Sequence, residues 1–483
     1  MSEEAGSGAS DPLHVIIIGA GLAGLATALS TKLANPSHRV TILEAVKELQ
    51  EVGVSCSVAL PFNHLPPPSS LLRSQSLSQA GLQLTPNATR LLDAWGLHSS
   101  LSVLATRPST LSVHRYDGAR LLAHEPRLQE TIQSRYGHPF WGLHRVELQR
   151  ALVDRCTALG VELRLSSRVR SVDFARATVT LDHEDRDVAT AIASASRPGS
   201  TIAGDVVVCA DGMWSATRAQ FLNRPSPLAL TGDLAFRIAI PIDSLKGPHK
   251  AELEAFIESE TVHFWIGPRS HGVSYTVKQG RMLNLGLLSP DNLPEGETKV
   301  IGDVEEMRSL FSDWDPLLRK LLDQVESVHK WKLCWVEPLD QWASPDGFFF
   351  MAGDCCHPML PYLAQGANSS LEDGAVLGYL LGKVGGRGTK DAQLPAAAAM
   401  YQRLRMGRGQ RIVMESFRQR DDFHLPDGPE QERRDEVMMA SLRPGEEPQP
   451  GFPSRWTCPE IQGFLYSYDA YAEAETAYRR DPY

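Results

Sequence analysis

The sequence has few cysteines, and their arrangement does not predict a structural metal site. Seven cysteines occur in 483 residues, with no CxxC pair and no histidine cluster at zinc spacing. We therefore expect no metal and a reducing compartment. Adjacent cysteines rarely bond to each other, so Cys355 and Cys356 are interpreted as buried, inert thiols. The other cysteines are Cys56, Cys156, Cys209, Cys334 and Cys458.

Long apolar runs and an excess of basic residues are also missing. No stretch reaches the roughly 18 apolar residues that span a bilayer, and the opening MSEEAGSGAS has none of the basic and apolar character of a secretory signal. The formal net charge of -10 provides no basic field for nucleic acid or an anionic membrane. We expect a cytoplasmic protein with no membrane span that acts on a small molecule.

A glycine-rich turn lies between two short apolar runs near the start of the chain. The stretch HVIIIGAGLAGLATAL predicts a strand, a turn and a helix, with Gly19, Gly21 and Gly24 spaced as GxGxxG. The first glycine permits the tight turn, the second lets the backbone approach a diphosphate, and the third lets helix and strand meet. Glu44 ends the next predicted strand, where a carboxylate can bind ribose hydroxyls. The pattern predicts a dinucleotide site without distinguishing NAD from FAD; an ordinary glycine-tolerant turn is the alternative.

Two later segments also place polar residues after an apolar run. In DVVVCADGMWSATR, Asp211 follows the run and Arg218 lies downstream, although an Asp-Gly pair there is also a common turn. In FFFMAGDCCHPMLPYLAQGAN, Asp354 follows a second run, and Gly366 and Ala367 precede a predicted helix. The amino end of that helix would favour the negative charge that a reduced flavin acquires.

In this order and at these separations, the three segments resemble the flavoprotein aromatic hydroxylases, the class of para-hydroxybenzoate and salicylate hydroxylases. Fungal salicylate-hydroxylase-like monooxygenases are the most similar in appearance. The likeness covers about residues 14–422 and includes AGLQLTPNATRLLDAWGL, LHRVELQRAL, GDLAFRI and WIGPRSHGVSYTV. It implies FAD as cofactor and NAD(P)H as electron donor, with no separate domain for the donor. No second GxGxxG follows a predicted strand, which agrees with that implication.

The resemblance also assigns cofactor contacts to single positions. Glu44 would hold the AMP ribose, Asp354 the ribityl or ribose region, and Arg145 would contact FAD from the start of a helix. Asp211, with Arg218 downstream, would lie beside both FAD and the nicotinamide donor. The expected cofactor-binding set is Gly19, Gly21, Gly24, Glu44, Gly81, Gln83, Arg145, Asp211, Asp354, Gly366 and Ala367.

Arg237 in GDLAFRI and Tyr275 in HGVSYTV are the candidate catalytic residues, and His271 is a weaker candidate. In related enzymes this region binds or orients a phenolate, whose charge the guanidinium of Arg237 would stabilise. The alternative is a strand arginine paired with a surface carboxylate and a tyrosine in the core.

The implied reaction is hydroxylation of a phenolic small molecule by NAD(P)H and O2 through a flavin C4a-hydroperoxide, in secondary metabolism or aromatic catabolism. Epoxidation or dearomatisation of the substrate with the same cofactor is the alternative reaction. A flavin halogenase would share these segments, but its WxWxIP phrase is absent. A NAD-dependent dehydrogenase would leave the second and third segments unexplained. We expect a monomer or a homodimer.

We expect an α/β fold, α+β overall, in which a Rossmann-like FAD-binding domain receives an inserted antiparallel β-sheet. The alternation in LAFRIAI, VHFWIGP, GVSYTV and MLNLGLL predicts that sheet, and helical periodicity returns at 303–325 and 396–420. The polar, Pro-rich end of the chain is expected to wrap the surface. The predicted divisions are 12–225 and 341–395 for the FAD-binding domain, 226–340 for the substrate domain, and 396–483 for a helical and extended tail.

Residues 54–79 interrupt this pattern. The stretch VSCSVALPFNHLPPPSSLLRSQSLSQ has no helix or strand period and separates EVG from AGLQLTPN. The segment begins with a valine, whose codons begin with GT, and ends with a glutamine, one of whose codons ends in AG. We therefore hypothesise that the segment is an intron translated in frame. The chain would then be a flavin-binding product without catalysis. A surface loop is the alternative, although long structureless loops inside compact domains are uncommon. A tryptic peptide joining Gly53 directly to Ala80 would support the intron, and peptides covering 61–70 would exclude it.

Overall fold

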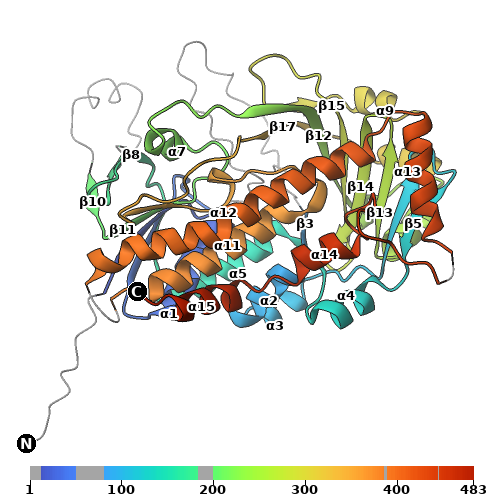
Figure 1. The fold of residues 1–483 in the computed structure, drawn as a ribbon. Coiled ribbons are helices and arrows are strands. Elements are labelled where there is room, and N and C mark those ends of the chain that lie inside the picture. The colour runs from blue at the N-terminus through green and yellow to red at the C-terminus, as the bar shows by residue number, and fades with distance from the viewer. Residues whose placement is uncertain (1–11, 50–80, 183–199, 386–388, 444) are drawn as a thin grey trace, which may run out of the picture.

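The computed structural model describes residues 12–49, 81–182, 200–385, 389–443 and 445–483. The predictions for Cys56 and for 54–79 lie outside this part of the chain. Two sheets lie toward opposite ends of the molecule, and the long helix α12, Lys390–Phe423, runs between them (Figure 1).

A five-stranded sheet has the order β18-β11-β1-β2-β7, and each of its four neighbouring pairs is parallel. Its central strands are apolar and buried along almost their whole length, as parallel strands between helical layers are. This sheet confirms the predicted Rossmann-like domain. Its strands are β1 His14–Ile18, β2 Arg39–Leu43, β7 Glu162–Arg164, β11 Val206–Cys209 and β18 Phe349–Met351.

Helix α11 packs closely against α1 because glycines line the contact. A Cβ atom at Gly374 would lie 2.4 Å from the Cβ of Ala26, and one at Gly378 would lie 2.4 Å from the Cβ of Ser30. The contacts advance in the same direction along both helices, so the helices are parallel and their amino ends lie at the same end of the pair. The helices span α1 Leu22–Ala34 and α11 Gln365–Gly382.

The second sheet has eight strands in the order β16-β17-β12-β15-β14-β13-β4-β5. Neighbours in it are antiparallel except β13 and β4, which are parallel. The predicted antiparallel sheet is therefore present, and it also includes two strands that precede residue 226. The strands are β4 Thr110–Arg115, β5 Leu121–Glu125, β12 Ala229–Pro241, β13 Thr261–Gly267, β14 Ser270–Val277, β15 Met282–Pro290, β16 Lys299–Gly302 and β17 Val328–Trp335.

The helical periodicity at 303–325 corresponds to two helices, α9 Val304–Leu310 and α10 Pro316–Leu322. The carboxylate of Asp315 caps α10 by accepting the N–H of Leu317 at 2.8 Å. The proline that follows the cap lacks the N–H that a continuous helix would need, but it suits the first position of a new one. The helical periodicity at 303–325 is therefore confirmed, and Pro316 divides the region into two helices.

The carboxyl-terminal region is more helical than its composition suggests. Helix α12 extends the predicted 396–420 helix at both ends. Beyond it, α13 contacts β5 and α15 contacts α11 (Figure 1). Buried side chains such as Trp456 and Leu465 attach the region to the core. These helices are α13 Pro429–Ala440, α14 Pro459–Tyr466 and α15 Ala470–Arg480.

Smaller elements connect these layers. They are the helices α2 Pro86–Ala94, α3 His98–Ser102, α4 Leu128–Tyr136, α5 Arg145–Ala158, α7 Ala216–Phe221 and α8 Lys250–Glu258; the strands β3 Gly81–Leu84, β6 Trp141–His144, β8 Val169–Asp173, β9 Thr178–Leu181 and β10 Thr201–Ala203; and the 3-10 turns η1 Ile242–Ser244, η2 Gly353–Cys355 and η3 Pro361–Leu363. The six cysteines among the described residues are buried and form no disulfide with one another. Within those residues, no helix is both long and apolar enough to cross a membrane.

Candidate active site

The segments selected from the sequence meet at one edge of the parallel sheet. Gly19 follows β1 and Glu44 follows β2, whereas Asp211 and Asp354 come shortly after β11 and β18. Because these four strands are neighbours and parallel, their carboxyl ends share that edge. Open α/β sheets bind their ligands there.

The glycine turn leaves no room for side chains at two of its glycines. Gly19 has a φ of +101°, and a Cβ there would lie 2.4 Å from the carbonyl oxygen of Ala210. A Cβ at Gly24 would lie 2.1 Å from the carbonyl oxygen of Gly19. The carboxylate of Glu44 accepts the N–H of Ala20 at 2.8 Å, so the turn and the predicted ribose-binding residue are in contact.

A cavity of about 260 Å³ lies between this edge and the eight-stranded sheet. Its walls come from β3, the amino end of α11, the 358–362 loop and strands β12, β14, β15 and β17. Of the predicted site residues, those lining it are Gly81, Gln83, Arg145, Arg237, His271, Tyr275, Asp354, Gly366 and Ala367. The predicted residues outside this lining are Gly19, Gly21, Gly24, Glu44 and Asp211.

The short sheet of β3 and β6 brings Gly81 and Arg145 to the cavity. Gly81 pairs with His144, so α5 begins beside β3. The N–H of Gly81 donates to Oδ1 of Asn284 at 3.1 Å, and a Cβ at Gly81 would lie 2.8 Å from the ring of Tyr275. Glycine therefore allows β3 to approach the large sheet closely.

Arg145 and Asp354 are opposite charges, each half-buried at the cavity wall. Burial lowers the pKa of Arg145, and the charge of Asp354 opposes this effect. Burial raises the pKa of Asp354, and the charges of His357 and Arg145 oppose it. Among the described residues, no carboxylate oxygen lies within 4.0 Å of the Arg145 guanidinium, which is the limit for an ion pair. The guanidinium therefore retains N–H donors for a ligand.

Arg237 and Tyr275 lie together on the large sheet. The guanidinium of Arg237 stacks over Trp331, 5.0 Å from its ring centroid. Burial lowers the pKa of Arg237, the charge of Tyr275 would raise it, and Arg145 lowers it. Burial also raises the pKa of the Tyr275 hydroxyl, although Arg237 opposes this. Two guanidiniums thus border one cavity, which favours an anionic ligand.

The amino end of α11 also reaches the cavity, at Ala364, Gly366 and Ala367. Ala364 caps the helix in a left-handed conformation, with a φ of +51°. A Cβ built on Gly366 would have its nearest neighbour at 3.9 Å, so there is space beside the helix end. The unpaired N–H groups and the dipole of a helix amino end stabilise negative charge.

Arg218 makes hydrogen bonds within the protein, and its role beside FAD or the electron donor stays a prediction. It is buried, and its Nη1 donates to the carbonyl oxygens of Met213 and Cys355, both at 3.0 Å. It therefore fastens the loop after β11 to the turn that carries Asp354. Asp211 accepts the Sγ–H of Cys209 at 2.9 Å, and its contact with FAD or the electron donor stays a prediction.

Several polar or large residues of the cavity wall were not predicted, among them Met213, Asn284, Trp331 and Lys332. Strand alternation indicates which residues share a face of a sheet, but it does not indicate which face borders a ligand. The register between strands would have found Asn284, because it pairs with Tyr275.

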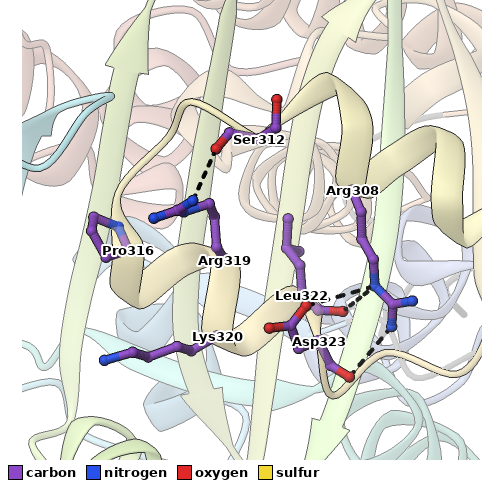
Figure 2. Close-up of a pocket in the computed structure, with 7 residues that line it drawn as sticks. All are labelled: Arg308, Ser312, Pro316, Arg319, Lys320, Leu322 and Asp323. Carbon is purple, nitrogen blue, oxygen red and sulfur yellow. Dashed lines mark hydrogen bonds and ion pairs between the residues drawn. The ribbon is translucent and has the colours of Figure 1, made fainter.

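A second hollow, between α9 and α10, has cationic side chains (Figure 2). These cations already have partners within the protein. Arg308 donates to the carbonyl oxygens of Leu322 and Val325, and Lys320 bonds the carboxylate of Glu252. We therefore place no ligand there.

The residues present fit a flavin dinucleotide that extends from the glycine turn into the cavity. A Cβ at Gly21 would have its nearest heavy atom 4.0 Å away, so the backbone is open where a diphosphate would approach. Gln83 lines the cavity, and its Nε2 is buried without a hydrogen-bonding partner among the described residues. A buried donor of this kind requires an acceptor, which the flavin ring system offers.

Comparisons with known proteins agree with this fit. The family described as FAD dependent oxidoreductase matches residues 14–360, and the family described as FAD binding domain matches residues 318–416. The FAD-dependent monooxygenase OpS4 of Beauveria bassiana (strain ARSEF 2860) is 44% identical over 471 residues, which cover 97% of each chain. The 3-amino-4-hydroxybenzoate 2-monooxygenase PtmB3 of Streptomyces platensis is 30% identical over 434 residues, 89% of this chain and 93% of that one.

Solved structures share the fold. A salicylate hydroxylase substrate complex has a TM-score of 0.71 at 20% identity, covering 97% of this chain and 98% of that chain. CtdE in complex with FAD and a substrate has a TM-score of 0.73 at 19% identity, with the same coverage. The structural neighbours show the fold, and the more identical relatives show the family. This chain therefore belongs to the FAD-dependent monooxygenases of the flavoprotein aromatic hydroxylase class, as the sequence motifs predicted.

Proposed function

We propose that the protein hydroxylates an anionic phenolic compound, using NAD(P)H and O2. The observation that carries the proposal is the charge of the cavity, where Arg145 and Arg237 both form part of the wall. Neither guanidinium has a carboxylate within 4.0 Å among the described residues. A phenolate or a benzoate would supply the missing negative charge, and Trp331 provides an aromatic surface beside Arg237.

The side chains of the large sheet would orient and activate the substrate. The guanidinium of Arg237 would stabilise a phenolate oxygen, which raises the electron density of the ring and favours attack by an electrophilic oxygen. Tyr275 keeps its proton because burial raises its pKa, so its hydroxyl can donate a hydrogen bond to a substrate oxygen. The apolar cavity wall would exclude water from the reacting groups.

The cofactor would lie along the other wall. Glu44 would hold the ribose, Gly21 would allow the diphosphate to approach, and Asp354 would bind the ribityl region. The amino end of α11 and Arg145 would stabilise the charge of the reduced ring. When bound, FAD supplies the electron transfer and oxygen activation, which protein side chains do not provide by themselves.

The test is NADH and NADPH oxidation by the FAD-loaded protein over a panel of hydroxybenzoates and their methyl ethers. We expect the hydroxybenzoates to stimulate oxidation and the ethers not to, with one atom of labelled O2 in the product. If every panel member yields only hydrogen peroxide, the proposal is wrong.

The chain with and without 54–79 should be assayed side by side. Activity in the shortened chain alone would support the intron hypothesis while leaving the proposed function intact. A shortened chain that stays colourless with excess FAD would contradict the proposed cofactor site.

A further inference from the structure

Four residues on neighbouring strands of the large sheet form a row along the cavity. Arg237 on β12 pairs with Gly286 on β15. Gly286 pairs in turn with Val273 on β14, which pairs with Phe264 on β13. These strands lie side by side (Figure 1). Paired residues direct their side chains to the same face of a sheet, and all four residues line the cavity. The row is therefore one continuous floor that crosses four strands.

Gly286 keeps the middle of this floor open. Apart from its chain neighbours, a Cβ built on Gly286 would have one described heavy atom within 4 Å, Cγ1 of Val273 at 3.4 Å. Gly286 is not among the glycines with a positive φ, so the strand conformation does not require glycine at this position. The missing side chain therefore leaves space between Arg237 and Val273 that a larger residue would fill.

The two ends of the row lie far apart. Three strand spacings separate the Cα atoms of Arg237 and Phe264, which is about 14 Å. The guanidinium of Arg237 stacks over Trp331 on β17, and β17 lies on the other side of β12 from β15. The charged group thus leans away from Phe264. A one-ring hydroxybenzoate held by this guanidinium therefore fills only the polar part of the row.

The end of the row opposite Arg237 is apolar. Phe264 is buried, and its ring centroid lies 5.1 Å from that of Trp456, which also lines the cavity. The indole N–H of Trp456 donates to the carbonyl oxygen of Tyr362 at 2.9 Å, so the polar group of this side chain is already satisfied within the protein. Phe264, Trp456 and Val273 therefore offer a ligand carbon surface.

Two polar side chains near the apolar end do not change its character. Burial lowers the pKa of His271 well below its ordinary value, so the imidazole is uncharged near pH 7. Nδ1 of His271 lies 2.8 Å from Nε2 of His424, and the hydroxyl of Tyr362 donates to Asp233 at 2.8 Å. Neither side chain supplies a charge to a ligand. A second charged group on a substrate would therefore lose its hydration at this end without gaining a partner.

We propose that the substrate is an elongated phenol. Its anionic oxygen lies beside Arg237, and an apolar substituent of several carbons, an alkyl chain or a second ring, extends across Gly286 toward Phe264. This inference rests on the proposed function, because the ring that is hydroxylated is the anionic end of the molecule. It adds the other end of the substrate, and it makes Gly286 the residue that determines how large a substituent the cavity accepts.

The test uses 3-hydroxybenzoates that carry hydrogen, methyl, propyl or butyl at carbon 5. This carbon is meta to both oxygen substituents, so the chain points away from whichever of them Arg237 binds. A 5-(3-hydroxypropyl) chain matches butyl in length but ends in a hydroxyl, and 3-hydroxy-2-naphthoate carries a second ring instead of a chain. Dissociation constants come from the flavin spectrum of the FAD-loaded protein without NAD(P)H, and stimulated NAD(P)H oxidation is measured separately.

The variants are Gly286→Ala and Gly286→Val, which place one and three carbons on the open floor. Gly463→Ala is the matched control, because a Cβ at Gly463 also has space and Gly463 does not line the cavity. The FAD content of each variant reports whether it folds.

We expect the affinity of the unmodified chain to rise by about 3- to 4-fold for each added methylene. The chain that ends in a hydroxyl should lose most of the gain that butyl gives, because the apolar end has no partner for it. Gly286→Ala should reduce the gain, and Gly286→Val should abolish it, so that the butyl and unsubstituted probes bind equally. Gly463→Ala should retain the full gain.

Two results would overturn the inference and leave the proposed function intact. In the first, the unmodified chain binds 3-hydroxybenzoate and oxidises NAD(P)H with it but gains no affinity from butyl or from the second ring. In the second, the butyl gain persists in Gly286→Val, which would place the chain elsewhere in the cavity. If no probe changes the flavin spectrum or stimulates oxidation, the proposed function itself fails, and the inference fails with it.

Discussion

Arg408 and Glu372 form a buried ion pair with two hydrogen bonds, from Nε to Oε2 and from Nη2 to Oε1, both at 2.8 Å. Arg405 also contacts Glu372, at 2.8 Å, and it bonds Asp373 at 2.7 Å. All four side chains are buried. The network joins α11, whose amino end borders the cavity, to the long helix α12. The network therefore stabilises the helix whose amino end forms part of the cavity wall.

Replacing Glu372 with glutamine should destabilise the protein strongly. The substitution leaves Arg405 and Arg408 with one fewer carboxylate in a buried environment, and such losses cost about 3–5 kcal/mol of unfolding free energy. Urea unfolding followed by circular dichroism would measure the change. Glu436→Gln, at an exposed position of α13, is the matched control and should change stability by less than about 0.5 kcal/mol. Equal stability of the two variants would show that the network does not stabilise the fold.

The pair of His357 and Asp373 should make stability depend on pH. Burial lowers the pKa of His357, but the charge of Asp373 and their 2.5 Å hydrogen bond outweigh burial and raise it above 6.5. Because the pKa of His357 is higher in the folded protein than in the unfolded chain, the pair stabilises the folded state fully below about pH 6.5. This stabilisation is lost as the pH rises through the pKa of His357 in the folded protein. The Tm difference between the unmodified chain and His357→Gln should therefore shrink as pH rises from about 6 to about 9. His249→Gln, an exposed control, should show no comparable trend; a Tm difference for His357→Gln that grows with pH would contradict the assignment.

The parts of the site that could be predicted depend on local pattern. An apolar run followed by glycine or aspartate marks the end of a buried strand, and this placed Gly19, Asp211 and Asp354 correctly after their strands. Parallel neighbours then bring such ends together without further information. The roles assigned through the resemblance, such as that of Arg145 beside FAD, agree with a position on the cavity wall and await a direct test.

The parts that could not be predicted depend on contacts between distant segments. Strand β4, Thr110–Arg115, pairs with β13, Thr261–Gly267, although the two strands lie far apart in the sequence, and neither strand has a residue pattern that identifies its partner. Charged residues usually indicate a solvated surface, so the buried pairing of Glu372 with Arg408 has no signal in the pattern. Periodicity likewise did not indicate the 2.8 Å contact between Nδ1 of His271, on β14, and Nε2 of His424, which follows α12, because a strand and a helix end have no common pattern.

The glycine contact between α1 and α11 should not tolerate a methyl group. In Gly378→Ala the new Cβ would lie 2.4 Å from the Cβ of Ser30 and 2.6 Å from the N of Thr31, so the helices must separate. We expect a loss of about 1–3 kcal/mol in unfolding free energy. Gly407→Ala, at an exposed position of α12 with no heavy atom within 4 Å of the new Cβ, should instead add about 0.5–1 kcal/mol because alanine favours helix. Changes of the same sign in the two variants would contradict this explanation.

Arg237 should determine affinity for anionic substrates. Arg237→Gln removes a charged donor from the cavity wall, and we expect the dissociation constant of 3-hydroxybenzoate to rise by about 10- to 100-fold, as for the loss of a charge-assisted hydrogen bond. FAD content should stay unchanged, which separates this effect from a damaged cofactor site. Arg281→Gln is the control, because Arg281 is exposed and pairs with Asp243 outside the cavity. Unchanged binding in Arg237→Gln would assign Arg237 to packing against Trp331.

Gln83 offers a prediction in which cofactor binding and stability change in opposite directions. Its Nε2 is buried without a partner among the described residues, and a buried donor in that state costs about 1–3 kcal/mol. Gln83→Met keeps the shape and removes the donor, so the FAD-free protein should become as stable or more stable in urea. The same change should weaken FAD binding by roughly 10-fold or more, measured by flavin fluorescence quenching, because the flavin loses the donor that it would satisfy. Gln133→Met, at an exposed position of α4, should change neither quantity. If Gln83→Met destabilised the FAD-free protein and left FAD binding unchanged, Gln83 would be a structural residue of β3, and the flavin would have to lie elsewhere in the cavity.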